Sequence, residues 1–303
     1  MPAASAPGSD RGCAHLNWFL LSLGAAVTQA AQFAIVKGRA QTIAPIVIVA
    51  WTQTVATLAW LVFFAVSGHA FTWSRAAWPA VLGSSVLVMG MATLIARASA
   101  RGDISIVGPV YALSPIFTVV PDAVLSGTLP SPLGWLGLGL AVAGTSNLSG
   151  GAAGGGSLRA LFARRDALDA LGAAVLLGFL AAVDRWGALA LGPPSYLVCS
   201  HGATAILTTA IALIRSPRGV AASTSRANLV TVVIHGLLGV TGTGMQTSAL
   251  TMAPAAYVNA IRRLSAVVAV VLGRTLFAEA DLGRRMTAAA LACAGAACLL
   301  LAR

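Results

Sequence analysis

Apolar residues along this chain are gathered into ten blocks that are separated by short polar connections. A helix needs about 20 mostly apolar residues to cross a bilayer, because each residue adds about 1.5 Å. The ten blocks have close to that length: Leu16–Val36, Ile46–Val66, Pro79–Ala96, Ile104–Ser126, Leu133–Leu148, Ala167–Leu191, Tyr196–Ile214, Leu229–Leu250, Ala255–Phe277 and Leu282–Ala302. The pattern predicts an all-α polytopic membrane protein with ten transmembrane helices.

The composition agrees with a chain that lies almost wholly in a membrane. Charged residues make up 9% of it and the mean hydropathy is +0.87, whereas a soluble domain carries roughly 25% charged residues. Residues 1–15 form a polar tail, and residues 150–166 form the longest connection, which includes the run GGAAGGGS. Such a run is typical of a flexible linker. We therefore expect two halves, residues 16–149 and 167–303.

Charge and cysteine content exclude several classes of partner. The net charge is +11, but the basic residues are scattered over the loops without a basic face, so no nucleic acid is predicted as a partner. No glycine-rich loop ends in Lys-Ser or Lys-Thr, so we expect no bound nucleotide. The four cysteines lack the spacing of metal ligands, and we expect neither a metal nor a cofactor. Lys37 is the single lysine beside eighteen arginines, which favours a GC-rich bacterial genome. For a multi-pass protein of a bacterium we expect the cytoplasmic (inner) membrane.

The two halves align when the sequence is shifted by 151 residues. Ten identities fall within the 38 positions from Val107 to Gly144, and they include Leu113 with Leu264. Each half contains five blocks, and an odd number of spans turns the second copy upside down relative to the first. Such inverted five-helix repeats are a recurring plan of secondary transporters, whose substrate lies near the midplane between the two copies.

Segments in both halves resemble a known transporter family. Tyr257–Ser265 (YVNAIRRLS) and Val271–Glu279 (VLGRTLFAE) resemble its penultimate span, and Asp103–Pro115 (DISIVGPVYALSP) resembles the matching fourth span. The chain is similar, from about Leu16 to Ala302, to the EamA-like family of the drug/metabolite transporter (DMT) superfamily. It departs from the pattern at Thr128, where the first copy usually carries a glutamate. The resemblance implies transport of small metabolites, with no single substrate.

Two adjacent arginines in the ninth block are the strongest candidates for a binding site. Arg262 and Arg263 lie seven residues or more from either end of the block, too deep for their charged ends to reach the interface easily. A guanidinium group holds a carboxylate or phosphate through two parallel hydrogen bonds, so we expect them to bind an anionic group of the substrate. Pairing with Asp122, Asp184 or backbone carbonyls stays open as an alternative.

Polar side chains from other blocks complete the predicted site. Tyr111 aligns with Arg262 in the repeat and should face it across the cavity, while Asn259 precedes the arginines on the same helical face. The candidate substrate-binding residues are Arg262, Arg263, Asn259, Tyr111, Gln29, Gln32, Gln246 and His201. The glutamines could equally well form hydrogen bonds that join helices, and the histidine could instead be a packed side chain with a structural role.

Other polar or small residues in the blocks favour structural roles. Gly236 and Gly239 are typical of a surface where two helices pack closely. Asp184 and Arg185 are neighbours in sequence, so they point in different directions on a helix. We place them near the far end of the sixth block, where long side chains reach the interface.

These features predict a secondary transporter or exporter of a small metabolite that works by alternating access between the repeats. Amino acids, other organic acids and amphipathic drugs stay open as substrates. No Gly-x-Ser-x-Gly or His-Glu-x-x-His motif occurs, so we do not expect an enzyme; a membrane scaffold or accessory subunit is the alternative. The expected partners are the lipid bilayer and a small-molecule substrate, with the chain as a monomer or homodimer.

The loop charges and the resemblance disagree about orientation. One set of loops carries twelve basic residues, and the opposite side, which includes both termini, carries three. The positive-inside rule then places the termini outside the cytoplasm. The resemblance implies cytoplasmic termini. We favour the orientation that the loop charges predict, with both termini outside the cytoplasm.

Overall fold

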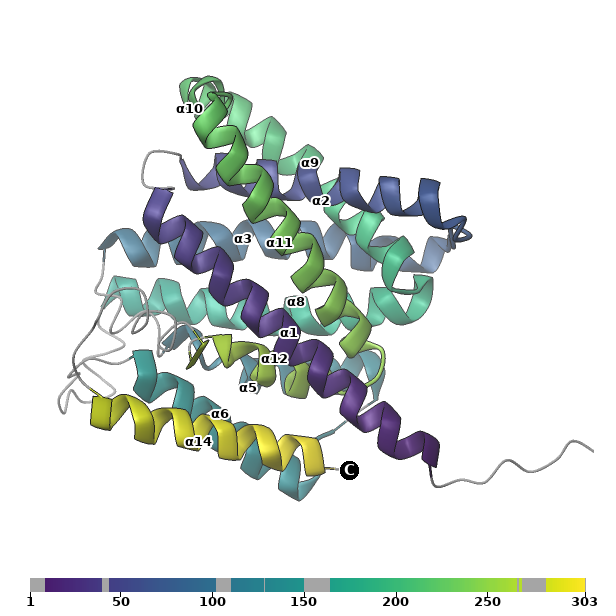
Figure 1. The fold of residues 1–303 in the computed structure, drawn as a ribbon, viewed down its shortest axis with the longest axis vertical. Coiled ribbons are helices and arrows are strands. Elements are labelled where there is room, and N and C mark those ends of the chain that lie inside the picture. Colours follow the sequence, from purple (N-terminus) through teal and green to yellow (C-terminus); the bar gives the residue numbers. More distant parts are fainter. Residues whose placement is uncertain are drawn as a thin grey trace, which may run out of the picture.

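The computed structural model of the chain describes residues 9–39, 44–101, 110–127, 129–149, 164–265, 267–268 and 282–302. Its regular structure in these ranges is entirely helical, and a helix lies on each of the ten apolar blocks (Figure 1). The elements are α1 (Ser9–Arg39), α2 (Pro45–Ser67), the 3₁₀ turn η2 (Arg75–Ala77), α3 (Trp78–Arg101), α5 (Ser114–Ser126), α6 (Pro132–Ser149), α8 (Arg165–Leu191), α9 (Pro193–Arg215), α10 (Pro217–Ser223), α11 (Arg226–Leu250), α12 (Ala255–Arg263) and α14 (Leu282–Leu301). The short α10, between the seventh and eighth blocks, was not predicted.

Prolines and glycines set several helix ends. α2 begins with Pro45 in its first turn and stops at Gly68, whose φ is 63°. Proline fits the first turn because its missing N–H would have no partner there. Glycine at the end of a helix adopts positive φ without steric strain. These signals explain why the helix bounds follow the apolar blocks closely.

The helices of the fourth and ninth blocks are interrupted by turns, which the sequence analysis did not predict. Residues 110–111 are helical, 112–113 form a turn, and α5 starts again at Ser114. Pro115 explains this break, because it cannot donate a backbone hydrogen bond and its ring clashes with the preceding turn. α12 ends at Arg263, and the next N–H, that of Leu264, donates to the carbonyl of Ile261 at 3.0 Å in a tighter turn. Thr128 and Glu279 lie outside the described residues.

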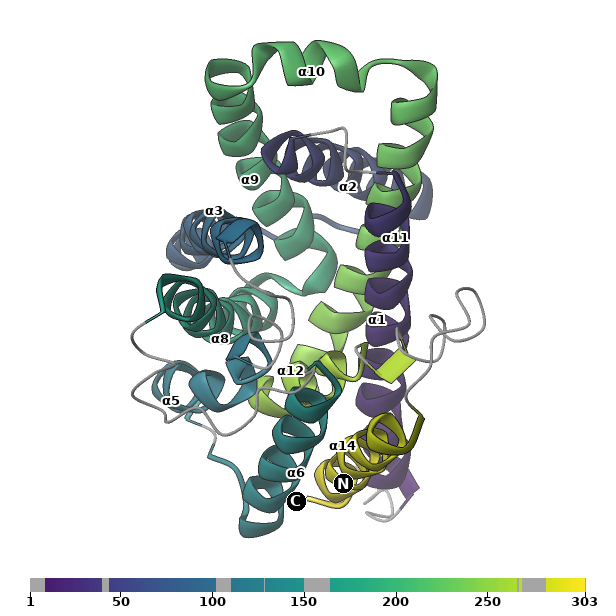
Figure 2. The same ribbon diagram turned by 90° about the vertical axis from the view of Figure 1, so that its left-hand side faces the viewer.

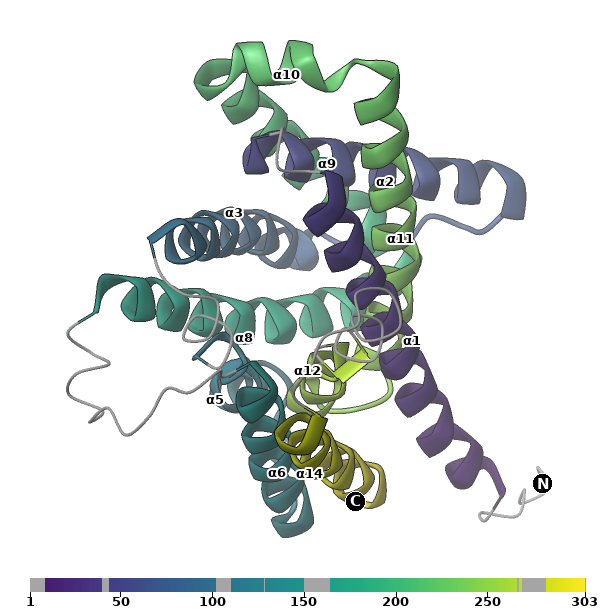
Figure 3. The same ribbon diagram turned by 60° about the vertical axis from the view of Figure 1, so that its left-hand side comes forward.

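The helices pack mostly in pairs that combine one helix from each half of the chain. α2 packs on α9, α3 on α8, α1 on α11 and α6 on α14. Figures 2 and 3 show α12 at the centre, between α1 on one side and α5 and α6 on the other. The two halves are therefore interleaved rather than separate bodies.

Small residues bring the paired helices close together. A side chain at Gly295 of α14 would meet the backbone of Ala141 in α6 at 2.3 Å, and one at Gly236 of α11 would meet Val55 of α2 at 2.7 Å. Helices in membranes associate through such small-residue contacts. The packing role expected for Gly236 agrees with this contact.

The distribution of side chains suits a membrane. Val66 and Ile214 expose 82% and 80% of their surface, whereas Asp122 and Arg263 expose only 1% and 7%. Lipid solvates the apolar exterior, and polar groups inside a membrane protein face its interior. Among the described residues, five helices are long and apolar enough to cross a membrane by length and composition: Ile46–Ser67, Arg75–Ile95, Arg165–Leu191, Pro193–Arg215 and Asn228–Leu250. The chain is a multi-pass membrane protein.

Candidate functional site

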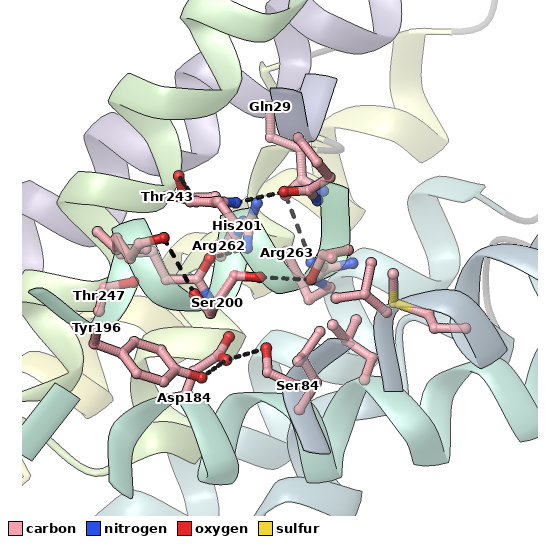
Figure 4. A pocket seen from close by; sticks show the side chains of 18 of the residues that line it. Gln29, Ser84, Asp184, Tyr196, Ser200, His201, Thr243, Thr247, Arg262 and Arg263 are labelled. Atoms are coloured by element: carbon pink, nitrogen blue, oxygen red, sulfur yellow. Dashed lines mark hydrogen bonds between the residues drawn. The ribbon is translucent and has the colours of Figure 1, made fainter. Parts of the chain in front are cut away.

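A polar cavity of about 180 Å³ lies where helices from both halves meet. The first half lines it from α1, α2, α3 and the helical residues 110–111 before α5, and the second half from α8, α9, α11 and α12. Figure 4 shows the arginines and Gln29 toward one side and Asp184, Tyr196 and Ser84 along another. Charges of both signs therefore face the same small space.

Arg262 and Arg263, in the last turn of α12, are held in this cavity by neutral groups. Arg262 Nη1 donates to Gln246 Oε1, and Arg263 Nη2 lies 3.5 Å from Gln29 Oε1. The Arg263 guanidinium also sits 5.3 Å from the centre of the Tyr111 ring, a distance that gives a cation–π attraction. Within the described part of the chain, neither guanidinium forms a salt bridge, and both Nε atoms are buried without a hydrogen-bond partner.

Buried guanidinium groups that lack a carboxylate partner among the described residues leave hydrogen-bonding capacity for a ligand. A charge near the centre of a bilayer costs at least about 2.5–3.5 kcal/mol, and buried donors without acceptors add to that penalty. An anionic group entering the cavity would supply both the countercharge and the acceptors. The predicted alternative, in which Asp122 or Asp184 pairs directly with these arginines, is not what the structure shows.

Asp184 of α8 brings a carboxylate to the same cavity. Its Oδ1 accepts hydrogen bonds from Ser84 Oγ at 2.8 Å and from Tyr196 Oη at 2.6 Å. Ser84 comes from α3 and Tyr196 from the first turn of α9, so two helices fix the orientation of this carboxylate. The sequence analysis placed Asp184 near the far end of its block, and it lies seven residues before the end of α8, with its side chain turned into the cavity rather than outward.

Arg185, the next residue, points away from the cavity. It exposes only 8% of its surface and its Nη1 lies 2.9 Å from Asp122 Oδ1. It does not extend to the interface as the sequence suggested. The expectation that Asp184 and Arg185 point in different directions is confirmed.

His201 also lines the cavity, with both ring nitrogens engaged. Nδ1 contacts Gln53 Oε1, and Nε2 lies 3.3 Å from Thr243 Oγ1. The three side chains come from α9, α2 and α11. The imidazole therefore links helices of both halves at the wall of the cavity.

Six of the eight candidate residues meet in this cavity, and two do not. The six are Arg262, Arg263, Tyr111, Gln29, Gln246 and His201. Asn259 is buried elsewhere and its Nδ2 donates to Thr118 Oγ1 at 2.9 Å. Gln32 Nε2 donates to the carbonyl of His235 at 3.0 Å, so it joins α1 to α11. Their polar groups are satisfied by helix contacts and do not reach the cavity.

The main residue that the sequence analysis missed is Asp184, together with its partners Ser84 and Tyr196. An aspartate within an otherwise apolar block is the signal for such a site, because an ionisable residue in a span usually faces the protein interior. The presence of Arg185 next to it obscured this signal, since adjacent opposite charges also suit a helix end.

Comparison with known proteins agrees with this architecture. Residues 16–149 match the model of the EamA-like transporter family, which confirms the resemblance to the DMT superfamily over that range. Among solved structures, a protein of known crystal structure superposes with a TM-score of 0.74 over 95% of this chain and 98% of that chain, at 21% identity. Identity at this level shows a shared fold. No curated protein matches the sequence.

Proposed function

We propose that this chain, whose residues 16–149 match the model of the EamA-like transporter family, is a secondary transporter that carries a small metabolite with an anionic group. The observation that carries the proposal is the cavity itself. It is polar, it lies between the two halves, and it contains two guanidinium groups without carboxylate partners among the described residues. In inverted-repeat transporters the substrate binds at that place.

We propose two repeats, residues 16–149 and 167–303, that are joined by the linker and related by a twofold axis in the membrane plane. The helix pairs support this. Such an axis exchanges α1 with α8, α2 with α9, and α3 with α11. It therefore maps the contact between α3 and α8 onto one between α11 and α1, and the contact between α2 and α11 onto one between α9 and α3. All four contacts occur. The pairs α2 with α9 and α6 with α14 map onto themselves and also occur.

The interrupted helices give a second, independent support for the repeat. The turn at residues 112–113 and the turn at Leu264 coincide under the 151-residue shift, because Leu113 aligns with Leu264. Tyr111 and Arg262, which align with each other, precede these turns and both line the cavity. Broken helices next to the binding site are typical of inverted-repeat transporters, since the break frees polar backbone groups near the substrate.

The position of the cavity supports a mechanism of alternating access. The cavity is lined by both copies, so rocking of one against the other would open it to each side of the membrane in turn. We place the chain in the cytoplasmic membrane of a bacterium, with ten helices crossing the bilayer. A scaffold or accessory subunit would not need the unpaired arginines at the centre.

Flux measurements test the proposal. A thermal-shift screen of the purified chain against metabolite classes first identifies a ligand, since binding to the folded state raises its apparent stability. Flux of that ligand into proteoliposomes should then be lost in Arg262→Gln and kept in Arg218→Gln, which removes an exposed arginine of α10. A folded Arg262→Gln protein that transports at the parent rate would show that this arginine does not bind substrate.

A further inference from the structure

The two oxygens of the Asp184 carboxylate have different surroundings. Oδ1 accepts both hydrogen bonds, from Ser84 and from Tyr196. Within the described residues, Oδ2 has no hydrogen-bond partner, although the side chain lines the cavity. The carboxylate is thus fixed in orientation through one oxygen and presents the other as a free acceptor.

This free acceptor shares a small space with the two arginines. A cavity of about 180 Å³ is small for a ligand site, so a molecule whose anionic group lies on Arg262 or Arg263 also approaches Asp184. A substrate with only negative charge would bring like charges together there, which disfavours binding. A protonated amine in the same molecule would neutralise Asp184 and donate to its open oxygen through a charge-assisted hydrogen bond.

We propose that Asp184 is the cationic-group subsite of the cavity and that the transported metabolite is a small zwitterion. Its anionic group binds Arg262 and Arg263, and its protonated amine binds Asp184 Oδ2. Tyr196 and Ser84 act as positioning residues, because they hold Oδ1 and so aim Oδ2. This inference rests on the proposed function and adds to it the requirement for a second, positive group.

Matched pairs of ligands test the inference without knowledge of the natural substrate. The probes are 2-amino acids and the 2-hydroxy acids with the same side chains, which keep the carboxylate and replace the amine by a hydroxyl. Affinities are measured on the purified full chain by calorimetry. The parent protein should bind the amino acid of at least one pair tenfold or more tightly than its hydroxy partner.

Asp184→Asn should reduce this preference to threefold or less, because the amide keeps the hydrogen bonds of Tyr196 and Ser84 but carries no charge. Asp166→Asn is the matched control: it removes another carboxylate of α8, one that pairs with Arg164 at 2.9 Å far from the cavity residues, and it should keep the full preference. The comparison of the two ligand series in the parent protein does not depend on whether Asp184→Asn folds.

Several results would overturn the inference. These are hydroxy acids that bind as tightly as amino acids, a preference that persists in a folded Asp184→Asn protein, or no binding in either series. Tighter binding of hydroxy acids at low pH in the parent, lost in Asp184→Asn, would show that Asp184 takes a proton instead of an amine. Hydroxy acids that bind through Arg262 would leave the proposed anion transport intact while removing the zwitterion requirement.

Discussion

Arg185 of α8 and Asp122 of α5 form an ion pair that is buried in the protein, with Arg185 Nη1 2.9 Å from Asp122 Oδ1. The same two side chains hold the connection between α11 and α12. Asp122 Oδ2 accepts from the N–H of Ala255 at 2.7 Å, and Arg185 Nε donates to the carbonyl of Leu250 at 3.0 Å. One pair of charges thus ties a helix of the first half to three helices of the second.

We predict that Asp122→Asn strongly destabilises the fold. The substitution removes the negative charge of the Asp122–Arg185 pair, and breaking a buried pair in this way costs about 3–5 kcal/mol. It also weakens the acceptor at the first N–H of α12. Thermal unfolding in detergent should show a large fall in melting temperature.

The pair between Arg164 and Asp166 provides the control, because its N–O distance is also 2.9 Å but the arginine side chain is 45% exposed. Exposed pairs contribute about 0–1 kcal/mol. Arg164→Gln should therefore change the melting temperature little. Equal effects of the two substitutions would show that burial does not set the strength of the Asp122–Arg185 pair.

We predict that Gly295→Ala destabilises the contact between α6 and α14. The new Cβ would lie 2.3 Å from the backbone nitrogen of Ala141, so one helix has to move, and overpacking of this kind typically costs about 1–3 kcal/mol. Gly139→Ala in α6 is the control, since its Cβ would meet nothing within 4 Å. That substitution should be neutral or stabilising, because alanine is the better helix former. The measurement is the melting temperature of each variant, which should fall for Gly295→Ala and stay the same or rise for Gly139→Ala.

The helices were predictable because long apolar blocks leave little freedom in a membrane. Each block had to satisfy its backbone hydrogen bonds internally, which only a helix does. The breaks at residues 112–113 and at Leu264 were not predicted. Pro115 gave a local signal for the first break, but nothing in the sequence around Leu264 distinguishes the second.

The sequence predicted those site residues whose charge lies deep within an apolar block, and it did not separate the other polar residues of the site from those outside it. Arg262 and Arg263 stood out because no partner was near in sequence and the interface was out of reach. Asn259 and Gln32 looked equally suitable, but Thr118 and the carbonyl of His235 satisfy them. Which polar group meets another helix and which meets a cavity is decided by rotation of the helices about their axes, and periodicity alone does not fix that rotation.

We predict that Arg262→Lys lowers transport without abolishing it, whereas Arg262→Gln abolishes it. A lysine keeps the charge but loses the planar fork that binds a carboxylate through two hydrogen bonds. It also loses the geometry of the contact with Gln246. Initial rates at several substrate concentrations should show a raised KM for the lysine variant. An unchanged KM would show that the guanidinium geometry does not matter for binding.

The last prediction concerns how the protein sits in the membrane. Among the described residues, Arg97 and Arg101 at the end of α3, Arg164 and Arg165 at the start of α8, and Arg218 in α10 belong to one set of loops, and Figure 1 shows these helix ends toward the same side. The turn between α2 and α3, which contains Arg75, lies toward the other side. Loops rich in arginine stay in the cytoplasm, so we expect both termini outside it.

Cysteine labelling at position 303 measures this directly. In a variant without native cysteines, Arg303→Cys should react in intact cells with a maleimide that does not cross membranes, and Lys37→Cys, in the connection between the first two blocks, should react only after the membrane is opened. The paired positions make each the control of the other, because they should lie on opposite sides. The reverse pattern, with position 303 protected and position 37 labelled, would show that the orientation implied by the family resemblance holds and that the loop charges do not set it.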